Sequence, residues 1–205
     1  MNIRLKGMGL ARGIFSVILI LGFCFSVTSA LAFASKERPR NERSRAAKFE
    51  IEFMTEMIDH HASALEMTEL CGERAIHDDL KNLCAEMNQA QAEEISQMQA
   101  WLIEWYDIEY EPQIKPSDQE IINRLAALSD TDFEIAFMQE MIMHHRMAII
   151  MTMRYYSKTF HEELQDMMLE IVVSQGAEIR QMQQWLCSWY SLCEMSTGMS
   201  DQKLP

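Results

Sequence analysis

The feature that most constrains this chain is an internal repeat. Residues 48–106 recur as residues 132–190, displaced by 84 positions without a gap. Each copy carries a Met-x-x-His-His core, formed by Met57, His60, His61, Met141, His144 and His145. Two copies of one unit fill most of the 205 residues, which predicts a fold built from one structural unit used twice.

Both copies have the pattern of a helical hairpin. Apolar residues fall three and four positions apart, the spacing of one face of an α-helix. The first predicted long helix runs from about Arg45 to Cys71, and the second from a turn at 72–77 to a point before Pro112. The third ends at about Tyr156 and the fourth at about Tyr190. Capping-box signatures predict helix starts at Ser117, Thr131 and Thr159, the first for a short connecting helix that reaches Leu128.

Short turns make the two helices of each hairpin antiparallel. No segment alternates with a period of two over the length of a strand. The pattern therefore predicts an all-α, up-and-down four-helix bundle made of two repeated helical hairpins. The bundle spans 48–190, its halves 48–106 and 132–190 are joined by a linker at 107–131, and 191–205 form a polar tail.

Residues 1–34 have the pattern of a secretory signal peptide. They contain basic residues near the start, an apolar run from Ile14 to Val27 and a final Ala32-Phe33-Ala34. The pattern predicts cleavage after Ala34, a flexible basic tether at 35–47 and a periplasmic or secreted protein. An uncleaved membrane anchor is the alternative. The net charge of -13 makes nucleic acid an unsuitable partner.

Four cysteines follow the leader, and an even number of thiols in an oxidising compartment is typical of disulfides. The pairs nearest in sequence are Cys71 with Cys84 and Cys187 with Cys193. Spacing does not decide the connectivity. Copper ligation by the thiols is the alternative, although the cysteines do not recur at equivalent positions of the two copies.

Methionine and histidine carry the chemistry of the chain. Of the 18 methionines, all but Met1 and Met8 follow the leader, and many surround the two His-His pairs. Thioethers are soft, neutral ligands that suit Cu(I), and imidazole binds both Cu(I) and Cu(II). The predicted copper ligands are Met54, Met57, His60, His61, Met67, Met138, Met141, Met143, His144, His145, Met147 and Met151.

Packing is the simpler explanation for many of these methionines, because the side chain fills helical cores well. Adjacent residues on a helix point about 100° apart, so one histidine of each pair must leave the apolar face. A His-His pair that is flanked by methionine and recurs in both copies has no evident packing role. The repeated positions of Glu94 and Glu178 predict a polar network that reaches the other helix of each hairpin. We expect the tryptophan pairs Trp101/Trp105 and Trp185/Trp189 to pack at the ends of the hairpins.

The motifs resemble a bacterial family long described as a domain of unknown function. The family pattern F-x-x-x-M-I-x-H-H-x-x-A-I-x-M, followed by Q-x-x-E-I-x-x-M-x-x-W-L, is matched from Phe53 and Gln91 and again, in part, from Phe137 and Gln175. Members look ferritin-like, and periplasmic copper-binding CopM proteins belong to the family. The resemblance implies extracytoplasmic copper binding and copper tolerance, with the two Met-x-x-His-His cores as ligands.

Together these features predict a non-enzymatic copper-binding protein that sequesters copper or hands it on to other periplasmic proteins. One alternative is a structural or interaction bundle with a methionine-rich face for a partner. Another is a ferritin-like oxidoreductase. A di-iron site would need Glu-x-x-His motifs, whereas Glu56 and Glu140 precede His60 and His144 by four positions.

Overall fold

The computed structural model describes residues 40–193, and side chains from Ser44 onward. The predicted signal peptide at 1–34, the first part of the tether and residues 194–205 of the tail lie outside this range. Between residues 40 and 193 no helix is both long and apolar enough to span a bilayer.

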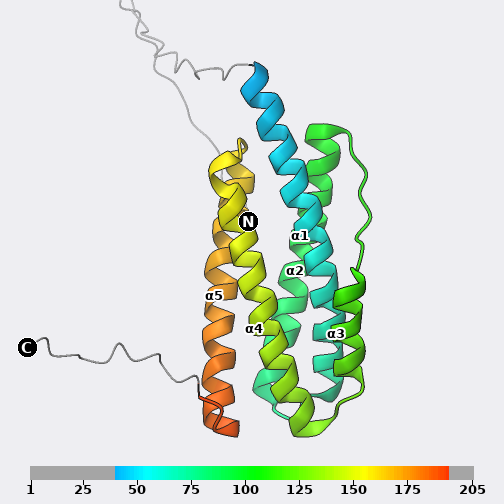
Figure 1. The fold of residues 1–205 in the computed structure, drawn as a ribbon, viewed down its shortest axis with the longest axis vertical. Helices are drawn as coiled ribbons and strands as arrows, with labels where there is room; N and C mark the ends of the chain where they lie inside the picture. Colours follow the sequence, from blue (N-terminus) through cyan, green and yellow to red (C-terminus); the bar gives the residue numbers. More distant parts are fainter. Residues whose placement is uncertain (1–39, 194–205) are drawn as a thin grey trace, which may run out of the picture. The chain divides into compact units, whose positions relative to one another are not determined.

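Every regular element between residues 40 and 193 is a helix, and this part of the chain contains no strand. Helices α1 (Arg40–Arg74) and α2 (Asp78–Tyr106) form the first hairpin, and α4 (Asp130–Tyr155) and α5 (Glu162–Tyr190) form the second (Figure 1). A 3₁₀ turn, η1 (Tyr156–Lys158), follows α4, and α3 (Pro116–Ala126) lies in the connection. The predicted all-α four-helix bundle of two hairpins is confirmed.

The connection between the hairpins determines how they pack. It runs back along the bundle before α3, so that α4 is antiparallel to α1 (Figure 1). Helix α1 packs against both α2 and α4, while α3 lies against α1 and α4. One long crossover of this kind is the connectivity of ferritin-like bundles.

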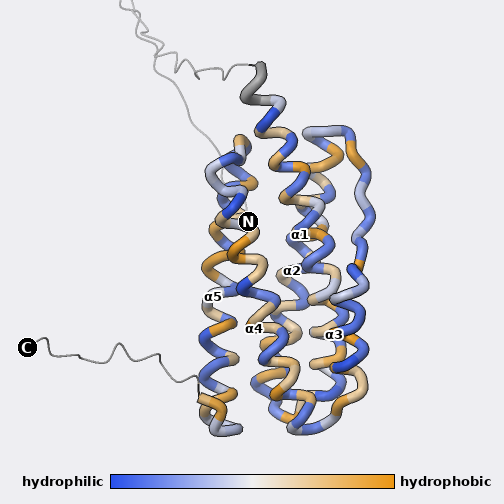
Figure 2. The backbone as a smooth tube through the Cα atoms, in the orientation of Figure 1, coloured by the Kyte–Doolittle hydropathy of each residue, from blue (hydrophilic) through white to orange (hydrophobic). Residues whose placement is uncertain are grey.

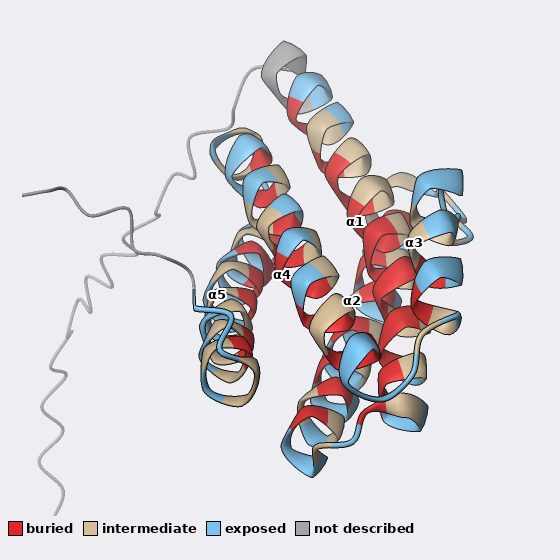
Figure 3. Cartoon of the chain, turned by 60° about the horizontal axis from the view of Figure 1, so that its bottom comes forward, coloured by how far each residue is buried: buried red, intermediate tan, exposed pale blue. Residues whose placement is uncertain are grey.

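Two apolar clusters fill the interior, one toward each end of the bundle. The repeat supplies both, since Phe53, Met54, Met57 and Ile58 are buried in one cluster and their counterparts Phe137, Met138, Met141 and Ile142 in the other. Apolar residues recur along all four long helices (Figure 2), and the buried positions of these helices face inward (Figure 3). On α1 and α4 the His-His pairs lie between the stretches that enter the two clusters. The histidines therefore form a polar layer at the middle of the bundle.

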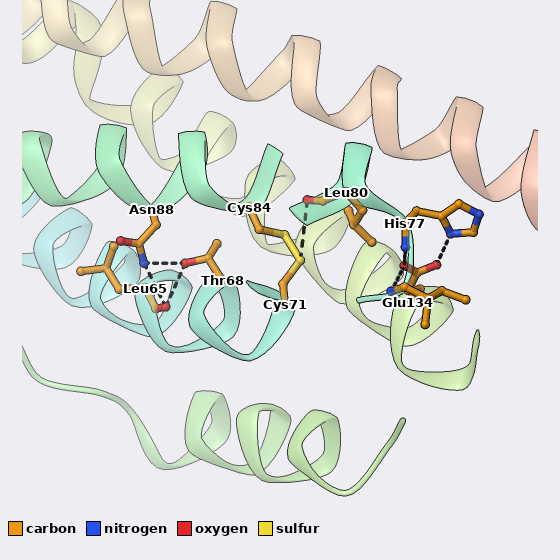
Figure 4. The surroundings of a disulfide bond; sticks show 9 residues. Leu65, Thr68, Cys71, His77, Leu80, Cys84, Asn88 and Glu134 are labelled. Atoms are coloured by element: carbon orange, nitrogen blue, oxygen red, sulfur yellow. Dashed lines mark hydrogen bonds and ion pairs between the residues drawn. A yellow bond between two sulfur atoms is a disulfide. The ribbon is translucent and has the colours of Figure 1, made fainter. Parts of the chain in front are cut away.

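The start of α2 is capped by a carboxylate from the other repeat. Glu134 of α4, whose side chain is fully buried, accepts hydrogen bonds from the backbone N–H groups of Ile76 (2.6 Å) and His77 (2.8 Å). It also contacts His77 Nδ1 at 2.7 Å (Figure 4) and accepts the hydroxyl of Tyr190. One side chain thus ties the turn of the first hairpin to both helices of the second.

Glu50 makes the equivalent set of contacts at the other end. It accepts the backbone N–H groups of Phe160 and His161 at the start of α5, contacts His161 Nδ1 at 2.9 Å and accepts the Tyr106 hydroxyl. Each repeat therefore caps a helix of the other, and neither hairpin can make its own cap in isolation.

The three predicted capping boxes are wrong. The helices begin at Pro116, Asp130 and Glu162, and their N-cap residues Lys115, Ser129 and His161 make no side-chain cap hydrogen bond. The signature is local, whereas a carboxylate in the core can reach a helix start far away in sequence. Glu134, the acidic residue of one predicted box, serves α2 instead.

The tryptophan pairs reinforce the same two ends. Trp101 and Trp105 stack with ring centroids 4.9 Å apart, and Trp105 stacks on His161 at 3.8 Å. Trp185 and Trp189 repeat this stack onto His77, at 4.8 Å and 4.0 Å. The predicted packing role at hairpin ends is confirmed, and it extends across the repeats.

Both sequence-near disulfides are present. Cys71–Cys84 joins α1 to α2 inside the first hairpin and is fully buried (Figure 4). Cys187–Cys193 closes a loop at the end of α5, where Cys193 is exposed. The thiol-ligation alternative does not apply to the oxidised protein, because a disulfide sulfur is not a thiolate.

The linker is fastened to α1 beside the histidines. The carboxylate of Asp59 accepts hydrogen bonds from the Tyr110 hydroxyl (2.9 and 3.0 Å) and from the backbone N–H of Gln113 (2.8 Å). Burial and this hydrogen bond raise the pKa of Tyr110 to about 12, so the hydroxyl stays protonated and keeps donating. The residue before His60 thus positions the segment that leads into α3.

Candidate metal centre

His60 and His144 meet at the centre of the interface between α1 and α4. They are repeat equivalents, and their ring centroids lie 3.6 Å apart with an interplanar angle of 33°. Ser63, a small residue of α1 that is buried at this level, lies with its Oγ 3.0 Å from His144 Nε2 across the interface. One histidine of each predicted pair therefore faces its counterpart.

Hydrogen bonding fixes which nitrogen of His144 carries the proton. Its Nε2 lies 3.1 Å from the carbonyl oxygen of His60 and 3.0 Å from Ser63 Oγ. A carbonyl only accepts, and the Ser63 hydroxyl donates to the same carbonyl at 2.7 Å. The proton therefore sits on Nε2 of His144. Its Nδ1, buried and without a hydrogen-bond partner, keeps a lone pair.

His60 has neither ring nitrogen satisfied. The residue is only 6% exposed, and both Nδ1 and Nε2 lack a hydrogen-bond partner. Burial, followed by the fields of His61 and His145, holds the pKa of His60 well below 6.5. Burial and the same cluster of rings lower the pKa of His144 as well. Both imidazoles are neutral at neutral pH and can offer lone pairs.

Leaving such a ring unpaired in the interior is costly, since a buried polar atom without a partner costs about 1–3 kcal/mol. Native structures keep few such groups, and those that persist often serve a site. A metal ion that accepts the lone pair would remove the cost at His60.

A pocket of about 160 Å³ opens at these two rings. Its soft wall consists of two imidazoles and four thioethers, from His60, Met67, Met143, His144, Met147 and Met151. Met143 and Met147 are 52% and 57% exposed and lie at the rim, whereas Met67 is buried. Six of the twelve predicted ligands, taken from both repeats, therefore line one pocket.

The other wall comes largely from α3 and its N-terminal flank. It is formed by Lys115, Ser117, Asp118 and Ile121, with Glu140 of α4 beside them. Arg124 of α3 donates to Glu140 at 2.9 Å, which fixes α3 next to the pocket. No pattern in the sequence pointed to these residues, because a linker helix shows its own amphipathic pattern but not the surface on which it packs.

The remaining six predicted ligands lie away from this pocket. Met54, Met57, Met138 and Met141 are fully buried in the two apolar clusters. His61 and His145 are fully buried and contact carboxylates on the neighbouring helix. Their Nε2 atoms lie 2.6 Å from Glu94 Oε2 and from Glu178 Oε2. The predicted polar network across each hairpin is confirmed, and it removes Nε2 of both residues from the pocket.

No three His, Cys, Asp or Glu side chains in the described part of the chain are grouped so that they could hold a metal ion. The pocket's donors are mainly thioethers, which that class of site does not include. The arrangement suits a soft monovalent cation rather than an ion that requires several oxygen ligands.

Comparisons with known proteins agree on fold and family. A family model described as "Domain of unknown function (DUF305)" matches residues 50–186. CopM in a Cu(I)-bound form is 31% identical, with a TM-score of 0.62 over 69% of this chain and 97% of that chain. CopM in a Cu(II)-bound form is 30% identical, with a TM-score of 0.63 over the same shares. CopM is also known in Ag-bound forms.

A DUF305 fragment from Deinococcus radiodurans is 30% identical, with a TM-score of 0.62 over 69% of this chain and 97% of that chain. Among curated proteins, none matches the chain.

Proposed function

The chain belongs to the DUF305 family, and we propose that it is an extracytoplasmic copper-binding protein whose metal pocket lies between α1, α4 and α3. His60 and His144 would bind the ion from the floor of the pocket, and the thioethers of Met67, Met143, Met147 and Met151 would complete the set. The similarity to CopM, solved with Cu(I), Cu(II) and Ag, supports the choice of metal.

The observation that carries the proposal is the state of His60. Its ring is buried and neutral, it has two unpartnered nitrogens, and it opens onto a wall of thioethers. A histidine retained only for packing would be expected to find a hydrogen-bond partner, as His61 does with Glu94.

Cu(I) is favoured over Cu(II). Neutral thioether and imidazole donors match a soft monovalent ion, and they leave little charge to stabilise a divalent one. Asp118 and Glu140 line the opposite wall, but they do not group with the histidines into a site of three or more such ligands, so Cu(II) would be held less well. Silver in CopM fits the same preference, since Ag(I) is a soft monovalent ion.

The exposed rim of the pocket favours a protein that sequesters copper and can exchange it with other proteins. Met143 and Met147 can meet a donor or acceptor protein without unfolding of the bundle, because about half of each side chain is exposed. The protein would carry copper without chemical turnover and so contribute to copper tolerance. The leader pattern at 1–34 and the two disulfides support a location outside the cytoplasm.

An anaerobic Cu(I) titration against a competing chelator tests this proposal with a matched pair of variants. Met147 and Met153 lie on the same helix and are 57% and 61% exposed, but only Met147 lines the pocket. Met147→Ala should weaken Cu(I) binding by roughly 10–100-fold, a range that even a lost outer-shell partner reaches. Met153→Ala should leave the affinity unchanged. Equal affinities for both variants and the unmodified protein would reject the pocket.

A further inference from the structure

The two disulfides lie in opposite environments. Cys71 and Cys84 are both 0% exposed and are enclosed between α1 and α2. Cys187 is partly exposed and Cys193 is exposed, and only six positions separate them in sequence. Thiol–disulfide exchange requires direct access of an attacking thiolate to a sulfur atom. Only the second disulfide offers that access in the folded protein.

The surroundings of Cys193 favour attack. Cys187 and Cys193 line a surface pocket of about 300 Å³ together with Arg180. Cys193 also lines a second pocket of about 360 Å³, with Met143 and Arg146 on its wall. The guanidinium of Arg146 lies 3.6 Å from Met143 Sδ on the wall of this second pocket, and a cationic wall favours the approach of a thiolate.

The fold does not depend on this bond to hold the end of α5. Ser191 adopts a left-handed conformation as the C-cap, with its N–H bonded to the Cys187 carbonyl at 3.1 Å. The N–H of Leu192 bonds to the Leu186 carbonyl at 2.9 Å. These hydrogen bonds keep the chain turned back after α5, so that the two thiols stay close together after reduction.

We propose that Cys187–Cys193 is a redox-labile disulfide whose reduced form binds an additional Cu(I) ion beside Met143. The reductant is a protein or small-molecule dithiol. Its thiolate attacks one sulfur, the S–S bond breaks, and its second thiolate resolves the mixed disulfide. Two electrons pass to Cys187 and Cys193, the dithiol becomes a disulfide, and the thiol protons are released when Cu(I) binds.

Thiolates are the softest ligands in proteins, and two of them can hold Cu(I) where a disulfide cannot. Met143 lines both the Cys193 pocket and the His60 pocket, so the second site would adjoin the first. The proposal goes beyond copper binding at the histidines, because its ligands are different side chains. It gives the protein a copper capacity that depends on the thiol balance of its compartment.

Graded reduction followed by alkylation and mass spectrometry tests the first step without copper. With limiting dithiothreitol, Cys187 and Cys193 should be alkylated about tenfold or more faster than Cys71 and Cys84, because exposure controls exchange. Equal rates, or earlier labelling of the buried pair, would overturn the proposal.

Copper counting tests the second step. After selective reduction and removal of the reductant, the protein should bind about one more Cu(I) and gain a thiolate-to-copper absorption band. The gain should persist in His60→Ala/His144→Ala, which lacks the histidine ligands, and vanish in Cys187→Ser/Cys193→Ser. No gain on reduction, or a gain that survives the double serine change, would contradict the inference. If His60→Ala/His144→Ala left Cu(I) binding by the oxidised protein unchanged while the gain on reduction was present, only the function proposed above would be rejected.

Discussion

Replacing Glu134 by glutamine should destabilise the whole bundle, although its side chain does not line the metal pocket. The fully buried carboxylate accepts from the N–H groups of Ile76 and His77, contacts the His77 ring, and accepts the Tyr190 hydroxyl. The amide keeps the volume but places an N–H₂ donor against these donors. At least one of them must lose its acceptor.

The size of the effect follows from those contacts. Hydrogen bonds to a charged group contribute about 1.5–3 kcal/mol each, and neutral ones about 0.5–1.5 kcal/mol. Weakening three of them and orphaning one buried donor should lower the free energy of unfolding by about 2–4 kcal/mol. That is a large part of the roughly 5–15 kcal/mol that stabilises a typical domain.

The contribution of Glu134 should also depend on pH. Burial alone would raise the pKa of Glu134, but hydrogen bonds from the His77 backbone, the Tyr190 hydroxyl, the His77 ring and the Ile76 backbone outweigh it and hold the pKa below 4.5. Below pH 4.5 the unfolded carboxylate therefore binds protons before the folded one does. The stabilisation is complete above that pH and declines as the pH falls through the folded pKa. Glu134→Gln should lack this part of the acid sensitivity.

Urea denaturation followed by circular dichroism measures both effects, with the disulfides kept oxidised. Glu93→Gln is the matched control, because Glu93 is exposed on α2 and bonds to the side chain of Gln89 on the same helix. Its change should stay within about 0.5 kcal/mol. A double-mutant cycle with Tyr190→Phe should show coupling between Tyr190 and Glu134. If Glu134→Gln behaved like the control at neutral pH, the cap from the other repeat would not stabilise the fold.

Two further predictions concern the linker and a helix end. Asp59→Asn should weaken the hydrogen bonds from Tyr110 and Gln113, lower stability by about 1–2 kcal/mol and speed amide exchange in α3, as hydrogen-exchange mass spectrometry would detect. Unchanged exchange in α3 would show that Asp59 does not hold the linker. Asp107→Gly should raise the free energy of unfolding by about 0.5–1 kcal/mol, because Asp107 is the C-cap of α2 with φ of 56°, a conformation that glycine adopts without strain. A loss of stability would mean that the Asp107 side chain has a stabilising role of its own.

The repeat made the architecture predictable. Helical spacing, short turns and a gapless second copy define two hairpins, and hairpins with one apolar face must bury it against each other. The sequence-near cysteine pairs were the simplest hypothesis although spacing did not decide the connectivity, and they are the pairs that the structure contains.

Contacts between the repeats were not predictable from local patterns. Glu50 and Glu134 look like surface acids or capping-box members in the sequence, and only the docking of α1 against α4 brings them to the opposite helix starts. The same docking selects His60 and His144 for the pocket and leaves His61 and His145 to Glu94 and Glu178.

The methionines show the same limit. Met57 and Met147 both lie within four residues of a His-His pair, yet Met57 is 0% exposed in a core cluster and Met147 is 57% exposed at the pocket rim. Helical spacing identifies a shared face but does not say which neighbour covers it. Which neighbour covers a face depends on how the hairpins and α3 pack together, and the sequence of a single helix carries no record of that packing.

The central claim is tested most directly by a crystal structure of the Cu(I)-loaded protein with anomalous data at the copper edge. We expect an anomalous peak within bonding distance of His60, His144 Nδ1 and at least one thioether of Met67, Met143, Met147 or Met151. A peak located only elsewhere, or none under saturating Cu(I), would contradict a copper site between α1, α4 and α3.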